Sequence, residues 1–211
     1  MTIADLSPRR AALVRRSTQL NVATLLYNSV EGVVALVAGA LAGSIALKGF
    51  GLDSLIELAA SLTALWRLRA DNDAERREGV ERLSLRVIGL LFLALAAYVG
   101  IDAVKALYSR EAPSESIVGI VLAALSVVVM PLLARAKRTV AFQLGSGALA
   151  AESAQTSLCA YLSAILLGGL LLNATISWWW ADPVAALAMV PIIAREGLEG
   201  IRGRSDCDDC F

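Results

Sequence analysis

Long apolar segments alternate with short polar ones along almost the whole chain. A helix that crosses the hydrocarbon core of a bilayer needs about 20 mainly apolar residues. Segments that meet this requirement run over residues 19–47, 50–66, 86–107, 117–134, 140–172 and 176–194. The pattern therefore predicts an all-α membrane protein with six transmembrane helices.

The second segment is the least apolar of the six because it contains Asp53 and Glu57. A β-strand is not favoured there, since the run Leu55–Ala60 shows no period-2 alternation. Only the stretch Lys48–Gly51 separates it from the first segment, and its two glycines can adopt the backbone angles of a tight turn. We expect the first two helices to form an antiparallel hairpin that turns at residues 48–51.

Positive charge lies at alternate ends of the segments. Of the 19 Lys and Arg residues, all except Lys48, Lys105 and Arg110 fall on one side of the predicted membrane. Because cytoplasmic loops carry an excess of Lys and Arg, this side is predicted to face the cytoplasm, and both termini are predicted to lie there. The run Trp178–Trp180 would then anchor the protein at the opposite headgroup level. We expect an integral protein of the cell inner membrane.

This arrangement divides the chain into three parts: a cytoplasmic segment at 1–17, a six-helix transport domain at 18–200 and a cytoplasmic tail at 201–211. The tail is too short to bury a core. Its Cys207 and Cys210 have a C-x-x-C spacing that could chelate a soft metal, although an unstructured end also explains them.

Composition narrows the classes of function. With 57% hydrophobic and 18% charged residues, the 211-residue chain does not read as an ordinary soluble domain. Its net charge of zero gives no support to a nucleic-acid partner. The sequence contains no His to act as a base, and Cys159 has no evident activating partner, so an enzyme is not expected.

Acidic residues inside the predicted spans carry the candidate chemistry. A charged side chain at the bilayer centre costs roughly 2.5–3.5 kcal/mol on insertion scales, so such a residue needs a cavity, a partner or a proton. Asp53 and Glu57 are four residues apart, which places both carboxylates on one helical face. They would repel each other unless a cation or proton lay between them, which predicts an exchangeable cation site. The alternative is a helix end at the interface, where both stay hydrated.

The fifth span offers a matching polar face. Glu152, Gln155 and Cys159 are spaced by three and four residues. If this face meets that of Asp53 and Glu57, then Gln155 and Cys159 complete four ligands, the number that a zinc-like ion prefers. Cys159 could instead be a small buried apolar residue, and Gln155 a hydrogen-bonding residue between helices.

The sequence neighbours of three further acidic residues indicate their roles. Glu31 follows Asn28 by about one helical turn and is expected to line the same cavity. Asp102 has basic residues close by and is expected to be interfacial. Asp182 precedes Pro183 and is expected to cap the sixth helix.

Several of these motifs resemble one family, the cation diffusion facilitators. Gly43–Leu47 (GSIAL) and Asp53–Glu57 (DSLIE) resemble its Gly-Ser-x-Ala-Leu run and its second-helix metal motif. Ala151–Cys159 (AESAQTSLC) occupies the place of its fifth-helix motif, Ala-Asp-x-x-His-x-x-x-Asp. Ala181–Pro183 also resembles the family, and the similarity extends over residues 18–200.

The resemblance implies a six-helix transporter that exports zinc or a related divalent metal in exchange for protons. It implies Asp53 and Glu57 as ligands, with Gln155 in place of the family's His and Cys159 in place of its Asp. Family members are usually homodimers with a further cytoplasmic domain, so this chain resembles the short members without that domain. A homodimer is then expected to rest on the membrane helices or on the tail.

Two functions remain open at this point. The first is a secondary transporter that alternates access to a midplane site, with lipid, protons and a divalent cation as partners and no organic cofactor. The second is a non-transporting scaffold or metal-sensing regulator on the same fold, which the altered fifth-helix motif favours. Zinc, cadmium, manganese and iron all remain candidate substrates, because ligand type and geometry set selectivity.

Overall fold

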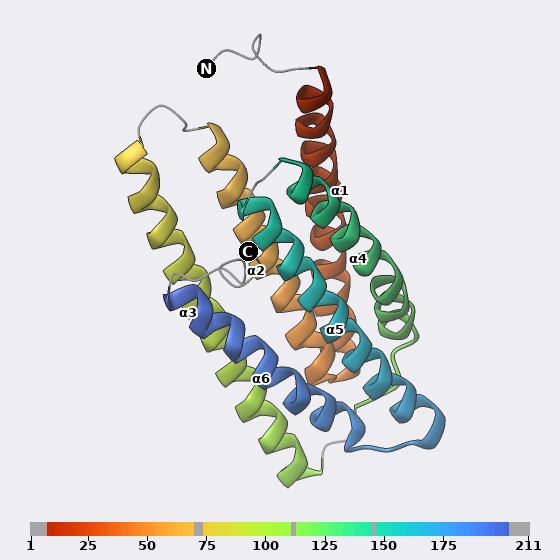
Figure 1. The fold of residues 1–211 in the computed structure, drawn as a ribbon. Helices are drawn as coiled ribbons and strands as arrows, with labels where there is room; N and C mark the ends of the chain where they lie inside the picture. The colour runs from red at the N-terminus through yellow and green to blue at the C-terminus, as the bar shows by residue number, and fades with distance from the viewer. Residues whose placement is uncertain (1–7, 70–73, 111–112, 145–146, 203–211) are drawn as a thin grey trace.

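The computed structural model describes residues 8–69, 74–110, 113–144 and 147–202, and these ranges are helical apart from short turns. The helices are α1 (Pro8–Ala42), α2 (Ile45–Arg69), α3 (Ala74–Ser109), α4 (Ile117–Leu144), α5 (Gly147–Ile176) and α6 (Ala181–Arg202). Successive helices run in opposite directions (Figure 1). The predicted all-α architecture is confirmed.

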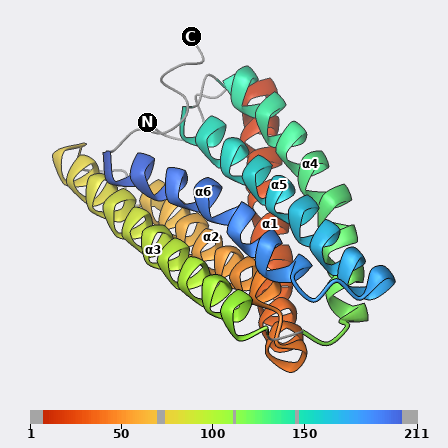
Figure 2. The same cartoon turned by 90° about the horizontal axis from the view of Figure 1, so that it is seen from below.

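The helices form two groups that meet at α2. Helix α1 packs against α2 and α4, α4 packs against α5, and α3 packs mainly against α6 (Figure 2). Helix α2 contacts α1, α3, α5 and α6. We call the end of the bundle where α1 begins and α6 ends the basic end.

Among the described residues, four helices contain segments long and apolar enough to cross a membrane. These segments are Ala11–Ala42, Arg86–Ser109, Ile117–Leu144 and Glu152–Ile176. Helices α2 and α6 are not among them, so the prediction of six apolar spans is confirmed in part. Because neighbouring helices surround α2, its carboxylates face protein and not hydrocarbon, which makes a polar helix tolerable there.

The turn between the first two helices is not where the glycines of Lys48–Gly51 predicted it. Helix α1 ends at Ala42, Gly43 has a φ of 69°, and Lys48–Gly51 lies inside α2. These two glycines allow close packing instead. A Cβ at Gly51 would lie 2.9 Å from Leu36, and one at Gly49 would lie 2.9 Å from Val99. The predicted antiparallel hairpin is present, with its turn at Gly43.

Other boundaries also differ from the hydropathy pattern. Helix α4 continues to Leu144, so residues 140–144 belong to it and not to the fifth span. Helix α6 begins at Ala181, after a turn in which the Trp178 and Trp180 rings stack with centroids 4.8 Å apart. Helix α1 begins at Pro8, inside the segment 1–17. Helices of a bundle extend past their apolar part because backbone hydrogen bonding does not require an apolar side chain.

Candidate functional site

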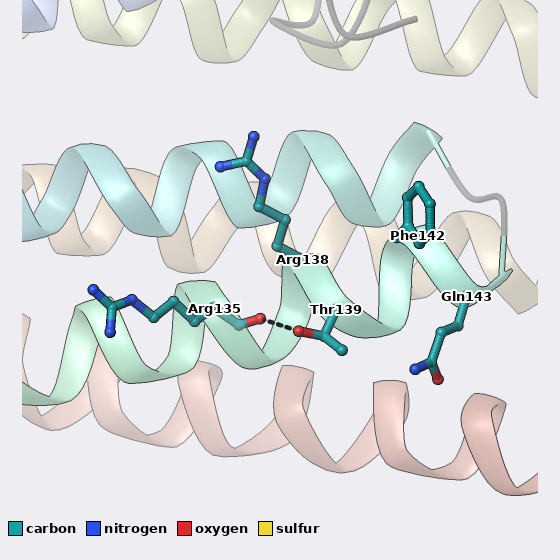
Figure 3. A pocket seen from close by; sticks show the side chains of 5 residues that line it. All are labelled: Arg135, Arg138, Thr139, Phe142 and Gln143. Carbon is teal, nitrogen blue, oxygen red and sulfur yellow. Dashed lines mark hydrogen bonds between the residues drawn. The ribbon is translucent and has the colours of Figure 1, made fainter.

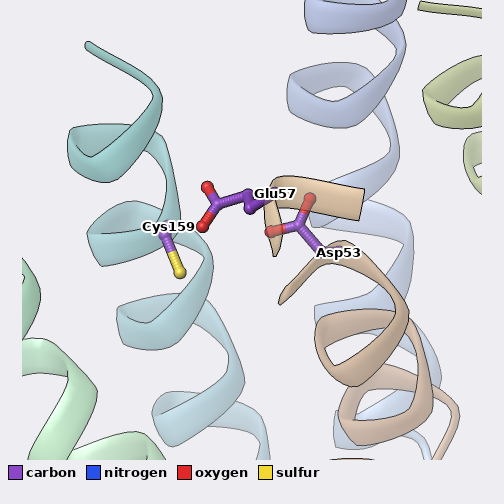
Figure 4. Close-up of side chains that lie close together, drawn as sticks. All are labelled: Asp53, Glu57 and Cys159. Carbon is purple, nitrogen blue, oxygen red and sulfur yellow. The ribbon is translucent and has the colours of Figure 1, made fainter. Parts of the chain in front are cut away.

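Two carboxylates and one thiol converge inside the bundle. Asp53 and Glu57 project from α2 toward Cys159 of α5 (Figure 4). Their carboxylate oxygens and the sulfur all lie within 4.8 Å of one another, and the three residues are at most 5% exposed. We call Asp53, Glu57 and Cys159 the acidic–thiol cluster. The expected meeting of the second and fifth helices therefore takes place.

The cluster lies far from either end of its helices. With a rise of about 1.5 Å per residue, Asp53 lies about 12 Å along α2 from Ile45. By the same rise, Cys159 lies about 18 Å along α5 from Gly147. The alternative of a hydrated helix end does not fit this depth and burial.

The two carboxylates have unequal hydrogen bonding. Asn28 of α1 donates from Nδ2 to Glu57 Oε2 at 2.8 Å. Asp53 Oδ2 is buried and accepts no hydrogen bond. A buried carboxylate oxygen without a donor is costly, because nothing replaces its hydration. A bound cation would supply the missing partner.

Gln155 lines a small cavity together with Asp53 and Glu57. Its volume is about 10 Å³, close to that needed for one water-sized body. Gln155 and Cys159 lie on one face of α5, as their spacing predicted. The amide of Gln155 is therefore available as a fourth group beside the cluster.

Glu31 is adjacent to the cluster but has its own partners. Ser54 Oγ donates to Glu31 Oε2 at 3.0 Å, and Ser126 Oγ donates to Glu31 Oε1. The Cys159 thiol lies 3.9 Å from Glu31 Oε2, and Tyr27 shares a hydrogen bond with Ser126 at 2.8 Å. Glu31 thus links α1 with α2, α4 and α5, and its carboxylate already accepts hydrogen bonds from two hydroxyl groups.

Glu152 is not brought into the cluster. It precedes Cys159 by seven residues, about 10.5 Å along α5. Its charge interacts with Lys137 of α4, and it lies beside Asn21 of α1. Lys137, Arg135 and Arg138 fall between the predicted spans 117–134 and 140–172, but all three belong to α4.

Glu196 of α6 lines the same cavity as Asp53 and Gln155 and was missed from the sequence. The predicted sixth span stopped at residue 194, whereas α6 continues to Arg202. Ile192 and Ile193 line this cavity too. Because residues three and four positions apart share one face of a helix, the apolar Ile192 and Ile193 could have indicated that Glu196 faces the interior.

Of the other two acidic residues considered, Asp102 lies where the sequence predicted, whereas Asp182 has a different role. Asp102 pairs with Lys48 at 3.7 Å, and both side chains are partly exposed, in keeping with an interfacial position. Asp182 does not cap α6. Its Oδ2 accepts the backbone N–H of Ile45 at 2.8 Å, and its Oδ1 accepts the hydroxyl of Ser44, so it caps α2.

Cys207 and Cys210 lie outside the described residues.

The sequence was also compared with known proteins. A family model, described as the cation efflux transmembrane domain, matches residues 22–203. The chain belongs to the cation efflux family. A comparison with curated proteins found no match. This cation efflux protein is accordingly an integral membrane protein of a family that transports metal cations.

Chemically, the cluster of this cation efflux protein gathers three groups that become negatively charged on deprotonation, in a place without bulk water. Two carboxylates and a thiolate provide oxygen and sulfur donors, and an amide lies beside them. Oxygen donors suit hard divalent cations, whereas a thiolate suits borderline and soft ones such as zinc. Like charges this close require a cation or protons to compensate them.

Proposed function

We propose that this cation efflux protein exports a divalent, zinc-like metal cation from the cytoplasm through the acidic–thiol cluster, with Gln155 as the fourth ligand. The observation that carries the proposal is the convergence of Asp53, Glu57 and Cys159 within 4.8 Å at the buried centre of the bundle. Four donors of this kind match the tetrahedral preference of zinc.

The ligand set supports proton exchange as the coupling. Carboxylate and thiolate must lose their protons before they bind a metal, and protons can replace the cation when it leaves. Alternating access would be a rocking of helices about a fixed midplane site. Helices α3 and α6 pack against each other more extensively than against the other helices, which is compatible with their movement as a pair.

The orientation proposed here places the basic end in the cytoplasm of the cell, at the inner membrane. It rests on the distribution of Lys and Arg, which biases loops toward the cytoplasm. A homodimer of this chain remains a prediction that mass measurement in detergent would test.

Metal flux into proteoliposomes tests the function. Asp53→Asn and Glu57→Gln preserve side-chain size and remove the charge, and each is expected to abolish zinc transport. Asp102→Asn is the matched control, because it neutralises a partly exposed carboxylate of α3 away from the cluster. Transport that continues unchanged in both cluster variants would refute the site.

Equilibrium binding separates transport from the scaffold or sensor alternative. A transporter should bind zinc saturably in detergent, lose binding in Asp53→Asn, and move zinc across proteoliposomes. Saturable binding that depends on Asp53, with no flux under any gradient, would favour a metal-sensing regulator. Absence of saturable binding would favour a scaffold.

A further inference from the structure

Lys137 is a buried cation that the proposed transport mechanism does not use. Among residues whose side chains the structure describes, it is the one Lys or Arg classed as buried, at 1% exposure. Its neighbours Arg135 and Arg138 are exposed and line an open depression on the other side of α4 (Figure 3). Burying an ammonium group is costly unless anionic or hydrogen-bonding partners surround it.

The side chain of Lys137 is directed at α5. Its Nζ donates to Thr156 Oγ1 at 3.3 Å, and that hydroxyl donates to the Glu152 carbonyl at 2.9 Å. Thr156 is the residue next to Gln155 and lies about one turn before Cys159. The ammonium group therefore contacts α5 one residue from Gln155 and about one helical turn from Cys159 along that helix.

Two carboxylates share the charge of Lys137. It interacts electrostatically with Glu152 and with Glu57 of the acidic–thiol cluster. Glu152 keeps one oxygen, Oε1, buried and without a hydrogen bond. The charge of Lys137 thus acts on a carboxylate outside the cluster and on one inside it, and the ammonium group is carried on a flexible four-carbon stem.

This position has a consequence for a divalent ion at Glu57. A fixed positive charge nearby repels the metal, and its attraction for Glu57 competes with the metal for the same carboxylate. When the metal leaves, the same ammonium group offsets negative charge that would otherwise be uncompensated. A carrier benefits from both effects, since it must release its cargo and return without it.

We propose that Lys137 is a built-in competitor of the transported cation. It pairs with Glu152 while the metal occupies the cluster, and it turns toward Glu57 when the metal leaves. The proposal rests on the proposed function, because it assigns a role in the binding cycle of the same site. In a purely structural role, Lys137 would join α4 to α5 through Thr156 and Glu152 without affecting metal affinity.

The test measures zinc binding to the purified full chain in detergent, by competition with a chromophoric chelator. Lys137→Met removes the charge and keeps the apolar stem. It is expected to bind zinc about tenfold tighter than the wild type, because the repulsion is gone. In proteoliposomes the same variant is expected to show slower saturated flux, because release is slower.

Arg138→Met is the matched control, since it removes a positive charge one residue away on the exposed side of α4. It is expected to leave zinc affinity unchanged. Glu152→Gln should shift affinity in the opposite direction from Lys137→Met. With its outer partner neutralised, the ammonium group would stay with Glu57 and weaken zinc binding severalfold.

If Lys137→Met does not yield monodisperse protein, Lys137→Met combined with Glu152→Gln removes both buried charges together. This double variant is expected to bind zinc more tightly than Glu152→Gln alone. Zinc binding in Lys137→Met that is no tighter than in the wild type, or in the double variant no tighter than in Glu152→Gln, overturns the competitor role, while loss of binding in Asp53→Asn would still uphold the site. A wild type that binds no zinc overturns both.

Discussion

The carboxylate of Asp182, in the first turn of α6, caps the N-terminus of α2 through Ser44. It accepts the Ser44 hydroxyl and the backbone N–H of Ile45, and Ala46 N lies 3.5 Å from its Oδ2. The first N–H groups of a helix lack intrahelical partners, and a buried helix end needs them satisfied. A residue 137 positions away in the chain from Ile45 therefore fixes the start of the helix that carries Asp53 and Glu57.

Asp182→Ala is expected to destabilise the protein by about 1–2 kcal/mol, because it leaves the buried N–H groups of α2 without an acceptor. Thermal unfolding in detergent measures the loss, with Asp102→Asn as a partly exposed control expected to change stability by about 0–1 kcal/mol. Hydrogen exchange should quicken at Ile45 and Ala46. Faster exchange confined to the first turn of α6 would show that Asp182 caps its own helix instead.

The α3–α6 contact is expected to be intolerant of a side chain at Gly89. A Cβ there would lie 2.7 Å from both the Gly197 carbonyl oxygen and the Ile201 nitrogen, which are backbone atoms that cannot move independently. We expect Gly89→Ala to lower the free energy of unfolding by about 1–3 kcal/mol. Gly100→Ala is the control on the same helix, since its Cβ would meet Val190 at an ordinary 3.7 Å. Equal stabilities of the two variants would contradict the close packing.

Replacement of Asn28 is expected to weaken metal binding without touching a proposed ligand. Its amide donates to Glu57 Oε2 and so orients the carboxylate. Loss of such a supporting hydrogen bond typically costs about 10–100-fold in metal affinity. Zinc titration of Asn28→Ala measures the effect. Ser157→Ala, which removes a hydroxyl bonded only to its own helix at Ser153, serves as control. Unchanged affinity in Asn28→Ala would mean that Glu57 does not bind the metal in this orientation.

Metal selectivity is expected to depend on the thiol of Cys159. A thiolate ligand binds cadmium and zinc more tightly than manganese, whereas a carboxylate ligand reduces this difference in affinity. Cys159→Asp should therefore lower the cadmium-to-manganese affinity ratio by about tenfold or more. Competition binding with both ions provides the measurement. A ratio equal to that of the wild type would assign Cys159 to the apolar core, where its buried neighbours would also place it.

Zinc binding is expected to weaken as the pH falls and to release protons. The carboxylate and thiol ligands bind metal only in their deprotonated forms, so acid competes with the cation. Calorimetry in buffers of different ionisation enthalpy counts the protons released. No proton release at any pH would remove the basis for proton exchange, while leaving metal binding itself in place.

Much of the site was predictable from local spacing. The four-residue interval between Asp53 and Glu57 and the similar interval between Gln155 and Cys159 placed each pair on one helical face. Such spacing survives folding because an α-helix fixes it. Glu152 shows the limit of the same argument: it shares the face but precedes Cys159 by about 10.5 Å along α5, and its charge interacts with Lys137.

The sequence alone determined the helical character of the chain, four of its six predicted apolar spans, the polar faces of the second and fifth helices and the motifs of the cation efflux family. These depend on residue type and on short intervals, which a helix converts directly into geometry. Only the tertiary structure decided that Gly43 makes the first turn, that Asp182 caps α2, and that Lys137 is buried beside Glu152. The physical reason is that the residue type alone does not show whether a charged side chain lies in an exposed loop or in the buried core. Contacts between helices that are distant in the sequence decide which of these two positions the side chain occupies.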